Sequence, residues 1–201
     1  YTLAAMIEEL GMEVVDLGLV PDSLSATIDA LARGAGTADC IISSGGVSVG
    51  EEDHVKAAVE NLGELGLWKV AIKPGKPLAF GFVRKTPDAD AVPFFGLPGN
   101  PVSSFVTFTV IAKPYLLKFQ GNEAAVENSL LVTSEFSFKT GGRREYLRVR
   151  VSGGNALTAA LYDGQGSGVM SSVSWANALA EVEANTQVLA GDKVKVHLLP
   201  D

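Results

Sequence analysis

A glycine-rich turn between an apolar strand and a helix constrains this chain more than any other stretch of its sequence. The apolar run at residues 38–42 leads into residues 43–46 (SSGG), and apolar residues recur at helical spacing after Asp53. Open α/β sheets form anion sites at such turns, because free backbone N–H groups and the positive end of the helix gather there. Residues 73–77 (KPGKP) add two cationic side chains beside a rigid turn. We therefore expect an α/β domain that binds phosphate or another oxyanion.

Taken alone, the glycine turn has a second interpretation as ordinary turn chemistry without a ligand. Its sequence is neither the dinucleotide-binding fingerprint nor a Walker A loop, because the glycine spacing differs and no Gly-Lys-Ser/Thr ends it. The lysines that follow (Lys69, Lys73 and Lys76) are likewise consistent with solvated strand ends. Both alternatives remain open on the local pattern alone.

Composition excludes several classes of protein. The 201 residues are 47% hydrophobic and 19% charged, and the formal charge is −7 without a basic tract, which argues against nucleic-acid binding. No apolar run approaches the ~20 residues of a membrane span and no leader resembles a signal peptide, so we expect a cytoplasmic protein. The single cysteine, Cys40, forms no intramolecular disulfide and is expected in the core. Two histidines leave no His/Cys metal cluster.

Hydrophobic periodicity predicts two domains. In the first domain we expect helices at residues 2–10, from 23 onward, at 53–61 and at 102–119 with a kink at Pro114, and strands at residues 12–20, 38–42, 67–72, 77–83 and 92–97. The texture changes at residues 121–128, where we place the domain boundary. Beyond it, short alternating strands and glycine turns predict a small all-β barrel or sandwich.

Two aspartates are candidate metal ligands. Asp22 and Asp53 each follow a predicted strand, and ligand sites of open α/β sheets lie beyond the carboxyl ends of the strands. The pair could hold a divalent cation beside bound phosphates. The alternative for Asp22 is a helix N-cap, which stabilises a helix by about 1 kcal/mol. His54 is a candidate general base or a surface helix histidine.

Two places in the second domain could carry chemistry. Four arginines (Arg143, Arg144, Arg148 and Arg150) lie in and after a turn, and most of them are expected at exposed alternate positions of a strand. Residues 164–168 (GQGSG) form a loop that carries a hydroxyl. Its alternative interpretation is a plain connection.

Three motifs carry a family resemblance. SGGVSVGEEDHVK, WKVAIKPGKPLAFG and GLPGNPVSSFVTF, in this order and spacing, resemble the MoeA family of molybdopterin molybdenumtransferases, to which gephyrin is related. Residues 1–121 resemble the family's MogA-like, three-layer molybdopterin-binding α/β domain, and residues 122–201 its C-terminal β-barrel domain. The family has further N-terminal domains and a first strand that would precede Tyr1. The chain therefore resembles the C-terminal portion of a family member.

The resemblance implies an enzyme of molybdenum cofactor synthesis that inserts molybdate into adenylylated molybdopterin and releases AMP. Mg²⁺ or Zn²⁺ is the implied cation, held by Asp22 and Asp53, which are also the implied catalytic residues. The implied substrate-binding residues lie in the same motifs and in the second domain: Gly45, Gly46, Ser48, Lys69, Lys73, Lys76, Pro77, Pro98, Asn100, Pro101, Arg143 and Ser167.

The resemblance also implies partners and leaves two alternatives for function. The expected partners are the pterin substrate, a second copy of the full-length protein and a MogA-like adenylyltransferase, with neither nucleic acid nor membrane. One alternative is a non-catalytic pterin-binding or scaffold module, as in gephyrin-like relatives. The other is a molybdopterin adenylyltransferase, which shares the α/β fold and lacks the barrel.

Overall fold

The chain forms two compact units. The structure is a computed structural model, and it describes residues 1–47, 54–122, 129–154 and 156–200. The first unit comprises Tyr1–Val70 and Gly75–Asn100, and the second comprises Ala71–Pro74 and Pro101–Asp201. The backbone therefore passes from one unit to the other three times, after Val70, after Pro74 and after Asn100.

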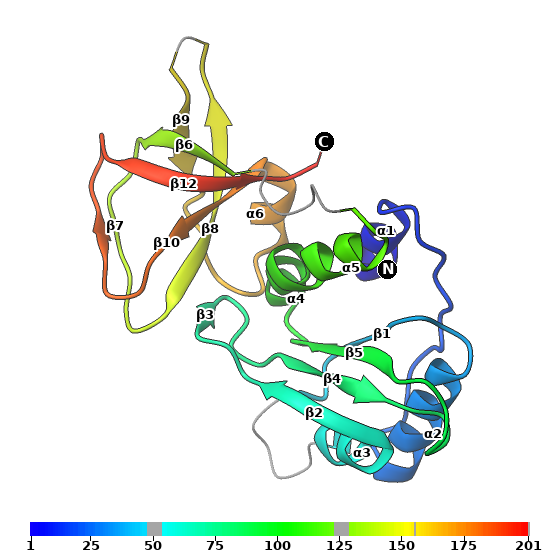
Figure 1. The fold of residues 1–201 in the computed structure, drawn as a ribbon. Coiled ribbons are helices and arrows are strands. Elements are labelled where there is room, and N and C mark those ends of the chain that lie inside the picture. Colours follow the sequence, from blue (N-terminus) through cyan, green and yellow to red (C-terminus); the bar gives the residue numbers. More distant parts are fainter. Residues whose placement is uncertain (48–53, 123–128, 155, 201) are drawn as a thin grey trace. The chain divides into compact units, whose positions relative to one another are not determined.

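The first unit is a mixed sheet covered by helices. Its described elements are α1 (Thr2–Glu8), α2 (Leu24–Ala35), β1 (Ile41–Ser44), α3 (His54–Leu62), β2 (Gly63–Trp68), β4 (Ala79–Val83) and β5 (Val92–Leu97). The strands are ordered β1-β5-β4-β2, with β1 parallel to β5 and the other neighbours antiparallel. Figure 1 shows α2 and α3 together on one face of this sheet.

The core of the first unit lies between that sheet and the two helices. Leu31 of α2, Val59 of α3 and Phe94 of β5 belong to one buried cluster. The side chain of Ser23 accepts a hydrogen bond from the Ala26 amide and caps α2. Since Ser23 is the cap, the N-cap alternative for Asp22 is wrong.

Two strand predictions in this unit were wrong in position. Residues 12–20 form no strand, because no described strand pairs with them and the Gly18 amide donates instead to the Asp16 carboxylate. The strand expected at residues 67–72 is β2, which begins at Gly63 and ends at Trp68. It ends there because Lys69 adopts a left-handed backbone conformation (φ 86°), which turns the chain.

The second unit is a small β-barrel with helices beside it. Its described elements are β3 (Ile72–Lys73), α4 (Pro101–Thr107), the π-helical turn η1 (Phe108–Ala112), α5 (Lys113–Phe119), β6 (Ser129–Ser134), β7 (Phe138–Lys139), β8 (Arg144–Ser152), β9 (Thr158–Leu161), α6 (Met170–Trp175), β10 (Ala178–Val182), β11 (Gln187–Val188) and β12 (Lys193–Leu198). The strand order β10-β12-β6-β9-β8 closes because β8 also pairs with β10. This closed barrel of five strands confirms the predicted fold class (Figure 1).

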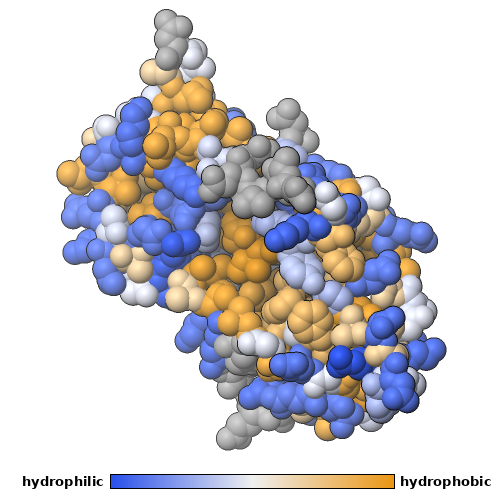
Figure 2. Space-filling view, viewed as in Figure 1, coloured by the Kyte–Doolittle hydropathy of each residue, from blue (hydrophilic) through white to orange (hydrophobic). Residues whose placement is uncertain are grey.

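Alternation along the barrel strands places apolar residues inside. Val132, Leu147, Val149 and Val196 are buried in one cluster. Some apolar side chains remain on the outside, and Figure 2 shows apolar residues gathered over β6 and β9, where Leu131 is 69% exposed. No helix in the described part of the chain is long and apolar enough to span a membrane.

The predicted long helix is continuous but irregular. It runs from Pro101 to Phe119, with the π-helical turn Phe108–Ala112 just before Pro114. Proline cannot donate to the preceding turn, and a π turn is one way in which a helix accommodates this loss. This helix belongs to the second unit by its contacts, whereas the sequence motifs suggested a boundary at residues 121–122. That boundary stays a prediction.

A network of charged residues lies on the barrel. Arg144 binds both Glu181 (2.9 Å) and Glu183 (2.7 Å), and His197 Nε2 lies 2.7 Å from Glu181 Oε2. Lys195 Nζ lies 3.7 Å from the same oxygen. Burial alone would raise the pKa of Glu181, but the hydrogen bond to His197 and the cations outweigh it and hold the pKa below its usual value.

Candidate functional site

Two turns of the first unit lie side by side where the parallel strands β1 and β5 end. The Gly45 amide donates to the Leu97 carbonyl (2.9 Å), and the Ser44 hydroxyl donates to the Pro98 carbonyl (3.4 Å). A Cβ atom added at Gly99 would lie 3.5 Å from the Cα of Gly45, so the two backbones are in close contact. The glycine turn and the PGNP turn thus share the carboxyl edge of the sheet, where α/β proteins bind ligands.

Glycine is required at the first of these turns. Gly45 and Gly46 have φ angles of 83° and 68°, in the left-handed region that other residues rarely adopt. A Cβ atom at Gly46 would also lie 2.7 Å from Val55 Cγ2 of α3. Of the neighbouring predicted site residues, Pro98 is buried and Asn100 is exposed. A residue with a side chain would therefore be strained at Gly45 and Gly46.

Asp22 lies near the start of α3. Its carboxylate is 87% exposed and lies 3.9 Å from His54 Nε2. Asp22 therefore reaches the residue that follows Asp53 in the sequence. Asp53 and Ser48 themselves lie outside the described residues.

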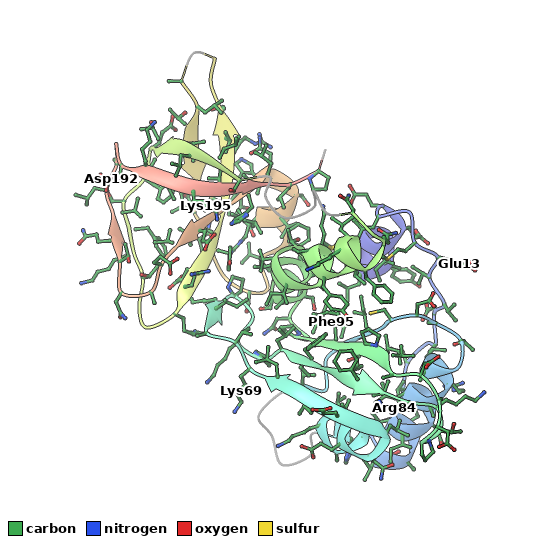
Figure 3. The ribbon with its side chains drawn as sticks, viewed as in Figure 1. Glu13, Lys69, Arg84, Phe95, Asp192 and Lys195 are labelled. Carbon is green, nitrogen blue, oxygen red and sulfur yellow. The ribbon has the colours of Figure 1, made fainter. Side chains whose placement is uncertain are left out.

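The lysine-rich segment begins as a hairpin of the first unit. The Lys69 amide donates to the Leu78 carbonyl (2.8 Å), and the Val70 amide donates to the Lys76 carbonyl (3.1 Å). Lys69 and Lys76 are exposed and Pro77 is half-buried. Figure 3 shows Lys69 at the end of β2, with its side chain pointing away from the sheet. Both ammonium groups are thus available to solvent.

Lys73 lies in the second unit and has a carboxylate partner. Its Nζ lies 3.1 Å from Glu145 Oε2 and 3.2 Å from Oε1. The Glu145 side chain is 7% exposed and that of Lys73 is 49% exposed. The pair is fixed by backbone pairing, because β3 runs parallel to the start of β8 with Lys73 opposite Glu145.

Arg143 is hydrogen-bonded to β3. Arg143 Nη1 donates to the Ile72 carbonyl (3.2 Å), and the Arg144 amide donates to the Ala71 carbonyl (3.1 Å). Two of the predicted site residues, Lys73 and Arg143, therefore lie on adjoining segments of the second unit.

Ser167 and Pro101 are brought together in the second unit. The Ser167 carbonyl accepts a hydrogen bond from the amide of Val102, the residue after Pro101 (3.1 Å). The loop that carries Ser167 thus meets the first turn of α4. Whether this loop binds a ligand or is a plain connection stays a prediction.

Glu145 was not among the predicted residues, and the sequence did not single out Arg148 from the four arginines or Gln165 from the loop at residues 164–168. Arg148 was expected at an exposed strand position, but it is 1% exposed because its guanidinium is enclosed and hydrogen-bonded. Burial lowers the pKa of Arg148 to about 10. Arg144, Arg148 and Arg150 lie on the same face of β8, so the sequence alone does not say which of them is covered by other elements.

A hollow of about 910 Å³ lies elsewhere in the first unit. Leu17, Leu19, Ala26, Ala32 and other residues of α2 and the extended segment line it. None of its lining residues is a predicted site residue, so it is separate from the turns described above.

Two family models match the chain. Residues 1–118 match one described as "Probable molybdopterin binding domain", and residues 132–199 match one described as "MoeA C-terminal region (domain IV)". The chain belongs to the MoeA family. The resemblance seen in the three motifs is thereby confirmed.

Other MoeA-family proteins are similar over much of this chain. It is 46% identical over 123 residues to the molybdopterin molybdenumtransferase of Haemophilus influenzae, covering 61% of this chain and 29% of that protein. It is 32% identical over 209 residues to the molybdopterin molybdenumtransferase of Nostoc sp., covering 100% of this chain and 47% of that protein. The crystal structure of a molybdopterin biosynthesis MoeA protein from Pyrococcus horikosii superposes with a TM-score of 0.78 at 28% identity, covering 100% and 47%. The chain thus spans less than half the length of these relatives.

Proposed function

We propose that this MoeA-family chain binds adenylylated molybdopterin and takes part in inserting molybdate into it with release of AMP. The observation that carries the proposal is the contact between the glycine turn and the PGNP turn at the carboxyl ends of β1 and β5. Relatives named molybdopterin molybdenumtransferase support the reaction class.

The chemistry of the candidate residues suits these substrates. Adenylylated molybdopterin and molybdate are both anions, whereas the chain carries a formal charge of −7. Attraction must therefore be local. We propose that Lys69 and Lys76 supply it in the first unit, and Lys73 and Arg143 in the second. Backbone amides at a glycine turn add hydrogen-bond donors without a competing side chain.

We propose Asp22 and Asp53 as the residues that would hold Mg²⁺ or Zn²⁺. In the described part of the chain, no group of three His, Cys, Asp or Glu side chains could hold a metal ion. Asp22 alone does not make a metal site, so we assign no step of the reaction to the ion. Bound there, a divalent cation would stabilise charge on the phosphoanhydride.

We further propose, from the family resemblance, that the protein acts in the cytoplasm, that its full-length form is a homodimer and that it receives its pterin from a MogA-like adenylyltransferase. Cell fractionation and sedimentation of the expressed protein test the first two points. A pull-down with the adenylyltransferase tests the third. Recovery of the protein in a membrane fraction, or sedimentation as a monomer at micromolar concentration, would contradict them.

The proposed function is tested by calorimetric titration with adenylylated molybdopterin, with and without Mg²⁺ and molybdate, while AMP is assayed. We expect binding in all mixtures and AMP only when the metal and molybdate are both present. Asp22→Asn and Asp53→Ala variants should bind the pterin within a few-fold of the wild type and release no AMP. Full turnover by Asp53→Ala would reject the metal role.

The alternatives give different results in the same titration. A scaffold module predicts pterin binding that molybdate and metal leave unchanged. An adenylyltransferase predicts that the chain forms the adenylylated pterin from molybdopterin and ATP. The match to the MoeA C-terminal region favours the transferase over the adenylyltransferase, which lacks that domain.

A further inference from the structure

The loop that carries Ser167 is fixed to β8 by the amide side chain of Gln165. Gln165 Oε1 accepts a hydrogen bond from the Arg148 amide (2.9 Å), and its Nε2 donates to the Arg148 carbonyl (3.0 Å) and the Tyr162 carbonyl (2.8 Å). The side chain thus pairs with the backbone of β8 much as a neighbouring strand would. Both of its polar atoms are used.

The side chain of Arg148 holds the same loop from the outer face of β8, because its neighbours Leu147 and Val149 face the barrel core. Its guanidinium donates to the Gly166 carbonyl (3.4 Å), the Tyr146 carbonyl (3.1 Å) and the Ser172 hydroxyl (3.1 Å). These three acceptors are uncharged, although Arg148 is 1% exposed. Burying a guanidinium costs free energy unless its donors are hydrogen-bonded, and the bonds to Gly166 and Ser172 tie this side chain to the loop and to α6.

The loop itself has little intrinsic rigidity. Three of its five residues are glycines, at positions 164, 166 and 168, and glycine gains the most conformational freedom when contacts are lost. The Ser167 carbonyl is fixed on the other side by the Val102 amide. The serine therefore stands between two anchors, one on the barrel and one on α4.

We propose that Gln165 and Arg148 are positioning residues that fix the backbone around Ser167 for oxyanion binding. The proposal rests on the proposed function for its ligand and on the hydrogen bonds above for its mechanism. Neither residue needs to touch the ligand. A displacement of about 1 Å at a reacting group greatly lowers the reaction rate. A loop held in one position can therefore offset the free-energy cost of burying the Arg148 guanidinium.

The first experiment measures the loop directly by amide hydrogen exchange of the wild-type chain and of Gln165→Leu. We expect the amides of Val102 and Val169, which donate to the carbonyls of Ser167 and Gly166, to exchange at least about tenfold faster in the variant, while the barrel strands keep their protection. Gln165→Glu serves as a second variant, because its carboxylate keeps the bond from the Arg148 amide and cannot donate to the two carbonyls. Gln187→Leu, at an exposed position of β11, is the matched control. Unchanged exchange in both Gln165 variants would overturn the proposal.

The second experiment is a double-mutant cycle on molybdate affinity, titrated in the presence of adenylylated molybdopterin. We expect Gln165→Leu to raise the Kd for molybdate about tenfold in the wild-type background and less than about twofold in a Ser167→Ala background. An equal rise in both backgrounds would show that Gln165 does not act through Ser167. If the wild-type chain binds no molybdate, the proposed function fails, and the exchange data still decide whether Gln165 fixes the loop. Exchange of Arg148→Leu at the same amides decides the role of Arg148 in the same way.

Discussion

Lys73 and Glu145 form an ion pair with unequal burial, since the lysine side chain is half exposed and the glutamate is almost entirely buried. Their strands run parallel at this point, so backbone pairing sets the distance between the charges. A lysine proposed to bind an oxyanion is thus already held by a carboxylate. An oxyanion bound there would share the positive charge of Lys73 with Glu145.

The two lysines of the KPGKP segment should therefore respond differently to removal. We expect Lys73→Ala to weaken molybdate binding and to lower the free energy of unfolding by about 1–3 kcal/mol, because it leaves the buried Glu145 carboxylate without this partner. Lys76→Ala should weaken molybdate binding with little change in stability, since Lys76 is exposed. Calorimetry and urea unfolding measure the two effects. Equal stability losses in the two variants would contradict this account.

The local motifs predicted the fold class and several turns, because glycine, proline and apolar spacing act within a few residues. The glycine turn, the PGNP turn and the barrel strands follow from such local rules. The left-handed Lys69 that ends β2 and the unpaired residues 12–20 could not be predicted, since each depends on whether a distant segment offers a partner.

The candidate site was predicted only in part for the same reason. Sequence patterns name a lysine or a serine, but the partners of those side chains come from remote segments. Glu145 meets Lys73 through the pairing of β3 with β8, and Gln165 meets the backbone of Arg148 because β9 returns antiparallel to β8. No spacing in the sequence encodes these contacts.

The charged network on the barrel predicts an acid-sensitive stability. The usual pKa of a glutamate is near 4.5, and the pKa of Glu181 in the folded chain is held below that value. The ionised Glu181 therefore contributes to stability above about pH 4.5, and this contribution is lost as the pH falls through the folded-state pKa. We expect Glu181→Gln to lower the free energy of unfolding at pH 6. The difference from the wild type should shrink as the pH is lowered to about 3.

Urea unfolding at a series of pH values checks this expectation. Glu135→Gln, at an exposed position, is the control and should follow the wild-type curve. A stability difference between Glu181→Gln and the wild type that stays constant from about pH 6 to about pH 3 would show that the network does not depend on ionised Glu181.

Cys40 is only partly buried, so its predicted place in the core was wrong, but it should still be a slow nucleophile in the folded chain. Burial, with a smaller contribution from the Asp39 carboxylate, raises the pKa of the Cys40 thiol to about 12. At pH 8 only about one part in 10⁴ is then thiolate, which is the reactive form. We expect a thiol-specific reagent to label the native chain at least about 10²-fold more slowly than the urea-unfolded chain. Comparable rates in the two states would refute the shift.

Gly81 should be essential to the pairing of β4 with β2. A Cβ atom there would collide with the Glu64 carbonyl and lie 3.2 Å from the Cα of Leu65, so the two strands would have to separate. We expect Gly81→Ala to lower the free energy of unfolding by about 1–3 kcal/mol. Gly141→Ala, where a Cβ meets nothing within 4 Å, should change it by no more than about 0.5 kcal/mol. Denaturant unfolding of both variants decides the point.

The three passages of the backbone between the units bear on how such proteins can be recombined. A single break at residues 121–122 would separate β3 and the helix that begins at Pro101 from the barrel to which their contacts assign them. A barrel exchanged between two relatives would then receive a foreign β3 beside β8, with a foreign lysine facing Glu145. Inheritance of the barrel as a module therefore requires that four residues far upstream, Ala71–Pro74, change together with it.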